Sequence, residues 1–230
     1  MCVSKTGIDI ARVKRASQYY LTLLNMGLTR ETALKLVSQK YYLTKSELMV
    51  LYRCIHPTIE SYYRRRKLIP PHEVRGKVLA VDGFNVIITL QSVIEGIPVC
   101  ISSDGLLRDI MKSYRKFSYN PTVHNKIIET MVKYISILLP RKAVIVYDKQ
   151  VSYSGVVASV TNSIIRKVHI EGQALVREKT DKTILEVGEV VASSDVVIVN
   201  KASKVFDLAY YIVLKENLIT KPNIHVMKMI

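Results

Sequence analysis

The apolar positions at the start of the chain recur at steps of three and four residues, which is the spacing of amphipathic helices. The first run follows Asp9, a helix-capping residue type, and continues to Gly27. The second run follows Thr29. A third run begins at Thr44 and Glu47, which have the spacing of a capping box. Three consecutive helices are therefore predicted between Asp9 and residue 55.

A fourth helical piece has the sequence TIESYYRRRK and runs into Pro70-Pro71. Prolines interrupt helices, and a proline pair is the strongest linker signal in this chain. We therefore predict a small, basic, all-helical domain over residues 1–70 and a linker over residues 71–76.

Beyond the linker the pattern changes to short, β-branched and nearly continuous apolar runs, which indicate strands buried on both faces. These runs are KVLAVD (77–82), IPVCIS (97–102), KAVIVY (142–147), EVVAS (189–193) and NIHVMKM (223–229). Helical patterns lie between them, one of them over Leu106–Tyr114. This alternation predicts an α/β domain over 77–230, with a parallel sheet and helices on both faces. DVVIV (195–199) is an alternative strand near the fourth run.

Charge adds a class of partner to this picture. The chain has 34 Lys and Arg against 19 Asp and Glu, and its formal net charge is +15. Residues 1–76 hold 14 of the basic and 5 of the acidic side chains, so the surplus is concentrated in the helical segment. A hydrophobic content of 49% excludes a disordered basic tail. The surplus therefore favours a folded protein that binds nucleic acid.

Cysteine usage and hydropathy indicate the compartment. The three cysteines, Cys2, Cys54 and Cys100, are widely spaced and odd in number, so no disulfide framework is expected. Cys54 and Cys100 are instead predicted to be core residues. No apolar run approaches the ~20 residues of a membrane span, and the opening residues lack the apolar segment of a signal peptide. We expect a cytoplasmic protein with no membrane partner.

Carboxylates follow the predicted strands. Ligands of open parallel sheets bind at the carboxyl ends of the strands. The aspartates found there, or just before the fourth strand, are Asp82, Asp104, Asp148, Asp181 and Asp195. Several carboxylates in one site need a cation, and oxygen ligands select Mg²⁺ or Mn²⁺. The alternative for each aspartate is a helix cap or a turn, and the cap is favoured for Asp104, before Gly105.

Four segments, VLAVDGFNVIIT, AVIVYDKQVSYSG, KTDKTIL and VVASSD, in this order, resemble the acidic motifs of PIN-like nuclease domains, particularly the NYN branch. The segment LTRETALKLVSQKYYLTKSELMVLYRCI resembles the N-terminal domain of an uncharacterised, largely archaeal family that pairs such helices with a PIN-like domain.

This resemblance implies a Rossmann-like three-layer α/β/α sandwich and divalent-metal-dependent ribonuclease chemistry. It implies that the metal-binding and catalytic acids are Asp82, Asp148, Asp181 and Asp195, with Asn85 as a polar companion. Val196 and Val197 follow Asp195, where the NYN pattern has a second acid. Many PIN-like proteins with fewer acids bind RNA or ribosomes without cutting.

The segment SYYRRRKL is a candidate RNA contact. Cationic side chains neutralise phosphates and aromatic rings stack on bases, and the residues concerned are Tyr62, Tyr63, Arg64, Arg65, Arg66 and Lys67. The alternative is that the tyrosines are core residues and the arginines form a solvated helix end. The sequence therefore predicts a Mg²⁺- or Mn²⁺-dependent, ribonuclease-like protein. The alternatives are a non-catalytic RNA- or ribosome-binding factor and a helical DNA-binding regulator.

Overall fold

A computed structural model describes residues 7–110, 117–218 and 226–228 of the chain. These residues form two compact units. The first unit holds 7–66, 92–110 and 226–228, and the second holds 67–91 and 117–218. Residues 92–110, which the sequence placed in the α/β domain, are therefore in the same unit as the N-terminal helices.

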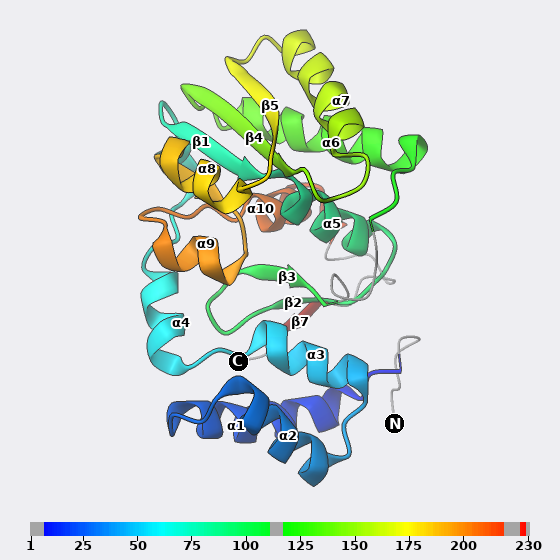
Figure 1. Cartoon of the computed structure of the whole chain (residues 1–230), viewed down its shortest axis with the longest axis vertical. Helices are drawn as coiled ribbons and strands as arrows, with labels where there is room; N and C mark the ends of the chain where they lie inside the picture. Colours follow the sequence, from blue (N-terminus) through cyan, green and yellow to red (C-terminus); the bar gives the residue numbers. More distant parts are fainter. Residues whose placement is uncertain (1–6, 111–116, 219–225, 229–230) are drawn as a thin grey trace. The chain divides into compact units, whose positions relative to one another are not determined.

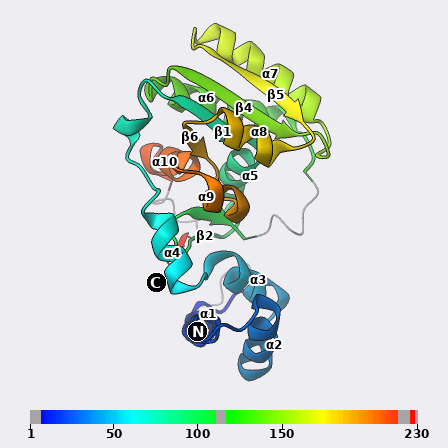
Figure 2. The ribbon, with the colours of Figure 1, turned by 60° about the vertical axis from the view of Figure 1, so that its left-hand side comes forward.

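The first unit begins with four helices, of which the first three are capped as predicted. They are α1 (Ile10–Asn25), α2 (Arg30–Tyr41), α3 (Lys45–Cys54) and α4 (Thr58–Arg65), shown in Figure 1 and from another side in Figure 2. Side chains of Asp9 and Thr29 accept hydrogen bonds from backbone N–H groups in the first turns of α1 and α2. Thr44 and Glu47 form the reciprocal capping box of α3. Local side-chain chemistry thus fixes where each of these helices begins.

A three-stranded sheet completes the first unit. Its strands are β2 (Val99–Ile101), β3 (Leu107–Asp109) and β7 (Val226–Lys228), in the order β3-β2-β7. The prediction that runs 97–102 and 223–229 join the parallel sheet is therefore wrong, because β2 pairs antiparallel with β3 and parallel with β7. The helix predicted from Leu106 is also wrong over β3. Gly105, with a φ of 85°, permits the tight turn that makes β2 and β3 a hairpin. Met111 and Tyr114 lie outside the described residues.

A disulfide joins two elements of the first unit. Cys54, the last residue of α3, is bonded to Cys100 of β2, 46 residues later. Both residues are fully buried, as expected of core positions. The bond contradicts the expectation that the chain has no disulfide framework, because hairpin formation brings β2 against α3, a pairing that sequence spacing alone does not indicate.

The second unit contains an all-parallel sheet, which confirms the parallel arrangement. Its strands are β1 (Val78–Asp82), β4 (Lys142–Asp148), β5 (Gly172–Arg177) and β6 (Val190–Ala192), in the order β5-β4-β1-β6 (Figure 2). Strand β5 was not predicted, because GQALVR is short, begins with glycine and has few β-branched residues.

Helices precede, connect and follow these strands. They are α5 (Gly83–Ile94), whose last residues belong to the first unit, α6 (Pro121–Ile137), α7 (Ser154–Lys167), α8 (Thr180–Val187), α9 (Val196–Lys201) and α10 (Leu208–Lys215), together with the 3₁₀ turn η1 (Pro71–Val74). The alternative strand DVVIV is wrong, because its residues Val196–Val199 lie in α9. The chain steps from β1 to β4 to β5 and then returns across the sheet to β6. Right-handed crossovers consequently place α6 and α7 on one face and α8 on the other.

Among the described helices, none combines the length and the apolar character that a membrane crossing requires.

Candidate functional site

Each strand of the parallel sheet ends in, or is followed by, a carboxylate. Asp82 and Asp148 are the last residues of β1 and β4. Asp181 lies in the first turn of α8, which follows β5, and Asp195 lies between β6 and α9. Because the strands are parallel, all four acids belong to the carboxyl edge of one sheet, where ligands of such sheets bind. Their order along the edge is Asp181, Asp148, Asp82 and Asp195.

Asp82 is connected to the segment that carries Asp195. The Oγ of Ser193 donates a hydrogen bond of 2.9 Å to Oδ2 of Asp82. The same Oγ accepts a hydrogen bond of 3.1 Å from the backbone N–H of Asp195. The other carboxylate oxygen of Asp82 accepts the backbone N–H of Asn85 at 3.3 Å. A single serine hydroxyl thus bridges two of the predicted acids.

Asn85 also binds the segment that carries Asp195, through Ser194. Its Oδ1 accepts hydrogen bonds from both the backbone N–H and the Oγ of Ser194, each at 3.0 Å. Asn85 and Ser194 are buried, so these bonds are shielded from water. Sequence reasoning had singled out Asn85 but missed Ser193 and Ser194. The string VVASSD, with two hydroxyl side chains between a buried strand and an acid, was the available signal.

Gly83 allows the chain to leave β1 close to a neighbouring ring. A Cβ at this position would overlap the ring of Tyr147, a fully buried residue of β4. Burial also raises the pKa of Tyr147, whose hydroxyl forms a hydrogen bond of 2.8 Å with Thr161. Close packing against Tyr147 therefore requires a glycine at position 83, the residue after Asp82.

Asp195 and Asp148 also have the local roles that the sequence left open. Oδ1 of Asp195 accepts the backbone N–H groups of Val197 at 2.8 Å and Ile198 at 3.4 Å, so Asp195 is the N-cap of α9. Oδ1 of Asp148 accepts the N–H of Gln150 at 2.8 Å. In each case these bonds are accepted by one carboxylate oxygen, Oδ1, and they fix the orientation of the carboxylate.

A hollow of about 630 Å³ lies beside two of the acids. Asp148 and Asp181 line it, and neither Asp82 nor Asp195 does. Its other charged side chains are Glu178, Lys179, Lys182, Glu186 and Lys201. Two of its glutamates are ion-paired, Glu178 with Lys149 at 2.7 Å and Glu186 with Lys182 at 3.6 Å. The hollow thus combines acidic groups with lysines, as a site for a cation and a phosphate would.

The predicted acids therefore form two sets, one bridged by Ser193 and the other at the hollow. Within the described ranges, no three His, Cys, Asp or Glu side chains are close enough to form a ready-made metal site. The donors at the edge are nonetheless carboxylate, amide and hydroxyl oxygens, the types that Mg²⁺ and Mn²⁺ prefer.

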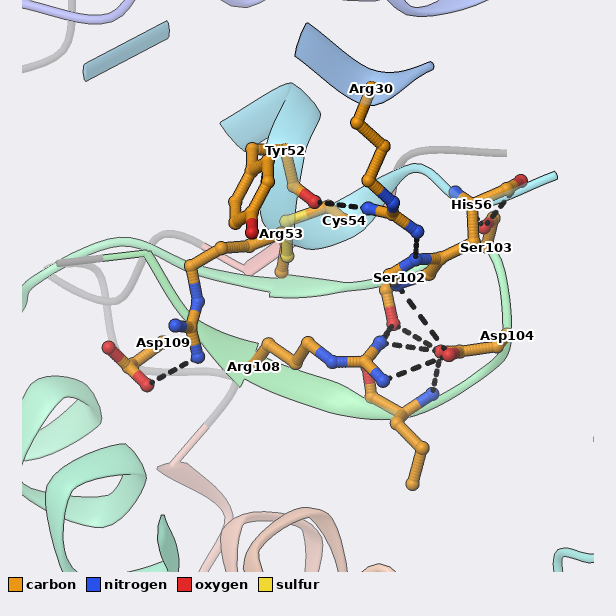
Figure 3. The surroundings of a disulfide bond; sticks show 12 residues. Arg30, Tyr52, Arg53, Cys54, His56, Ser102, Ser103, Asp104, Arg108 and Asp109 are labelled. Carbon is orange, nitrogen blue, oxygen red and sulfur yellow. Dashed lines mark hydrogen bonds and ion pairs between the residues drawn. A yellow bond between two sulfur atoms is a disulfide. The ribbon is translucent and has the colours of Figure 1, made fainter. Parts of the chain in front are cut away.

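Asp104 is placed differently from the other acids. It belongs to the first unit, and its fully buried carboxylate receives Arg108 at 2.6 and 2.9 Å (Figure 3). Arg64 adds a contact of 3.3 Å and the Ser102 hydroxyl one of 2.6 Å. These donors use both carboxylate oxygens, so Asp104 belongs to an internal ion-pair network of the first unit, which contradicts its prediction as a metal ligand.

Electrostatics within this network follow from burial and from the arginines. Burial opposes ionisation of Asp104, but the nearby Arg108 outweighs it and lowers the pKa of Asp104. Burial, followed by the charge of Arg108, lowers the pKa of His56 to about 2. Nδ1 of His56 lies 2.7 Å from an Arg30 nitrogen, which can only donate, so the neutral ring carries its proton on Nε2.

The segment SYYRRRKL divides into exposed and buried side chains. Tyr62 and Tyr63 are 52% and 58% exposed, so the alternative that they are core residues is wrong. Arg64 is only 2% exposed and pairs with Asp104 and Glu60, which contradicts its prediction as a phosphate contact. Arg64 neutralises the buried carboxylate of Asp104, a role that the basic segment in the sequence did not indicate.

The remaining cations of this segment are held by backbone or ring contacts. Nε of Arg65 donates to the carbonyl of Ser103 at 2.8 Å. Nζ of Lys67 donates to the carbonyls of Val199 at 3.0 Å and Asn200 at 2.6 Å. The guanidinium of Arg66 lies 5.7 Å from the centre of the Tyr62 ring. Tyr62, Tyr63 and Arg66 are therefore the candidates of this segment that are most available to a ligand.

Two family models match different parts of this chain. A family model described as "Domain of unknown function (DUF5616)" matches residues 71–211, and one described as "Protein of unknown function (DUF434)" matches residues 12–67. An uncharacterised protein of Methanocaldococcus jannaschii is 33% identical over 193 residues, which cover 81% of this chain and 88% of the relative. No solved structure matches the chain. Because the first model spans more than half of the sequence, the chain belongs to the DUF5616 family.

Proposed function

We propose that this protein acts on RNA and that its second unit is a PIN-like domain that hydrolyses phosphodiester bonds with the help of Mg²⁺ or Mn²⁺. The observation that carries the proposal is the carboxylate at the end of, or just after, each of the four parallel strands. Carboxylates that approach one another repel, and a divalent cation bound between them relieves that repulsion.

The proposed roles follow from the contacts of each side chain. Asp82 and Asp195 would hold the cation, since Ser193 bonds to both residues and fixes their spacing. Asp148 and Asp181 would complete the site from the neighbouring hollow. A divalent cation bound there would activate water and stabilise the charge that develops on the phosphate. Asn85 acts as a positioning residue, because it holds Ser194 beside these acids.

RNA is the proposed partner on electrostatic grounds. The charge of +15 favours a polyanion, and an acidic edge by itself would repel one. Lys179, Lys182 and Lys201 line the same hollow as Asp148 and Asp181, so cationic groups are available where a phosphate would approach.

A second candidate is a non-catalytic RNA- or ribosome-binding factor. It is favoured by the hydrogen bonds that both carboxylate oxygens of Asp82 accept, from Asn85 and from Ser193. In this case the acids at the edge would serve as caps and hydrogen-bond acceptors, and the basic surface would account for binding.

Calorimetric titration with Mn²⁺ separates these candidates. The proposed nuclease should bind Mn²⁺ in the wild type and lose most of that affinity in Asp82→Asn, because a ligand charge is removed. The binding factor should show no Mn²⁺ binding that depends on Asp82, and its RNA affinity should be insensitive to chelator and fall steeply with salt. Asp9→Asn is the matched control, because Asp9 caps α1 in the first unit and asparagine is an equally good cap.

A further inference from the structure

A second, smaller hollow lies within the first unit, beside α4. Its volume is about 190 Å³, and it is lined by Leu21 of α1, by Tyr62 and Arg65 of α4, and by His56, Ser61 and Ser103. All of these residues belong to the first unit. Since a water molecule occupies about 30 Å³ of liquid volume, the hollow accommodates a ligand of roughly six water volumes, such as a single heterocyclic ring.

One of the polar residues that line the hollow, His56, carries a buried donor. Nδ1 of His56 accepts a hydrogen bond from Arg30, so Nε2 carries the proton. Nε2 is buried, and the described residues offer it no hydrogen-bond partner. The nearest carboxylate oxygen, Oδ2 of Asp104, is 3.6 Å away, beyond hydrogen-bonding distance. A buried polar atom without a hydrogen-bond partner is uncommon in folded proteins. A ligand that supplies the missing acceptor would explain it.

Two serine hydroxyl groups add to the polar lining. The Oγ atoms of Ser61 and Ser103 lie 2.9 Å apart and share one hydrogen bond, in which either can donate. Each hydroxyl has further acceptor capacity, so the pair can present a donor or an acceptor to a ligand edge. Arg65 is fixed beside them by its bond to the Ser103 carbonyl.

Two of the lining side chains, Tyr62 and Leu21, offer apolar surface. Tyr62 is about half exposed, its ring packs edge-on against that of Tyr63 at 5.7 Å, and Leu21 adds an aliphatic surface. A lining that combines an aromatic ring with polar groups matches the two surfaces of a nucleobase, which stacks through its face and hydrogen-bonds through its rim.

We propose that this hollow binds one unstacked base of a single-stranded RNA. The base stacks on Tyr62, and its polar rim faces His56 and the two serines. Paired bases cannot present a free rim in this way, so the site selects single strands over duplexes. The proposal rests on RNA as the partner of this protein, and it does not depend on cleavage.

Fluorescence anisotropy with labelled oligouridylate, measured with chelator present, tests the proposal. Tyr62→Ala should weaken binding about 10-fold, within the range for loss of one stacked base. Tyr42→Ala is the control, because Tyr42 is an exposed tyrosine of the first unit that does not line the hollow, and it should change the affinity by less than about 2-fold. Leu21→Trp leaves the Tyr62 side chain in place but fills the hollow with a larger side chain. It should therefore weaken binding as much as Tyr62→Ala does.

An abasic oligonucleotide of equal length should bind the wild type about 10-fold more weakly than oligouridylate. Equal effects of Tyr62→Ala and Tyr42→Ala, equal affinity for the abasic strand, or no binding of oligouridylate would each overturn the proposal. A parallel cleavage assay with Mn²⁺ separates the two claims. A Tyr62-dependent affinity without cleavage would support the base site and contradict the nuclease, and cleavage without a Tyr62 effect would do the reverse.

Discussion

The Oγ of Ser193 donates a hydrogen bond of 2.9 Å to Oδ2 of Asp82, although the two residues are 111 positions apart in the sequence. Asp82 ends β1 and Ser193 follows β6, the neighbouring strand. The bond therefore joins two strand ends at the edge where the acids gather. It holds in place the carboxylate on which the proposed function depends most.

Replacing Ser193 by alanine tests how far this bond stabilises the second unit. Both groups are buried, so Ser193→Ala should lower the free energy of unfolding by about 1 to 2 kcal/mol, the cost of leaving a buried acceptor without one of its donors. Urea denaturation measures the change. Ser136→Ala is a suitable control, because its hydroxyl bonds only within α6 at an exposed site. An equal, small effect of both substitutions would mean that the bond to Asp82 contributes nothing measurable.

His56 predicts a pH dependence of stability. Burial and Arg108 lower its pKa, so the folded protein keeps the ring neutral while the unfolded chain takes up a proton below its ordinary pKa of 6.5. The unfolded state then binds more protons, and the free energy of unfolding should fall as pH drops below 6.5. For one such group the slope approaches about 1.4 kcal/mol per pH unit.

The charged groups that surround His56 are Asp104, Arg108, Arg30 and Arg64. Asp104, whose pKa is lowered, contributes stability that is present above its ordinary value of 3.8 and is lost only as pH falls below it. Because Asp104 stays ionised between pH 6.5 and 5, the difference in slope between the wild type and a His56 variant in this window reports on His56. His56→Asn retains an acceptor for Arg30 and should flatten the slope in this window. Denaturation curves at several pH values that show the same slope in both proteins would refute the assignment.

The disulfide gives a prediction that requires no activity. Of the three cysteines, Cys54 and Cys100 should be paired, so protein purified without reductant and then denatured should show one reactive thiol. Reduction should lower the free energy of unfolding by roughly 3 to 4 kcal/mol, because the bond closes a long loop. Cys2→Ser should leave the bond intact and abolish the remaining thiol signal. Three reactive thiols in the oxidised wild type would contradict the pairing.

The features predicted correctly from the sequence are those that depend on neighbouring residues. Asp9, Thr29 and Thr44 begin their helices because a cap needs only a side chain and the next turn of backbone. Strands β1, β4 and β6 were recognisable because burial on both faces makes them continuously apolar.

The features that were missed depend on distant pairings. Cys100 meets Cys54 only after β2 and β3 form a hairpin, and Arg64 is buried because Asp104 returns to it from 40 residues away. From sequence alone, a charged residue is predicted to be exposed unless its ion-pair partner is known. Of the candidate site, the acids and Asn85 followed from strand ends, whereas Ser193 and Ser194 emerged only from the contacts of the folded edge.

Cleavage of single-stranded RNA by Asp195→Asn tests the central claim most directly, because asparagine can keep the cap of α9 while removing the charge. With Mn²⁺ present, the wild type and the Asp9→Asn control should cleave equally. Asp195→Asn should lose at least about 100-fold in rate, comparable to the loss of one transition-state interaction of about 2.7 kcal/mol. Its urea midpoint should remain that of the wild type. Cleavage by Asp195→Asn at the wild-type rate, or wild-type cleavage that persists in chelator, would contradict a catalytic metal site at this sheet edge.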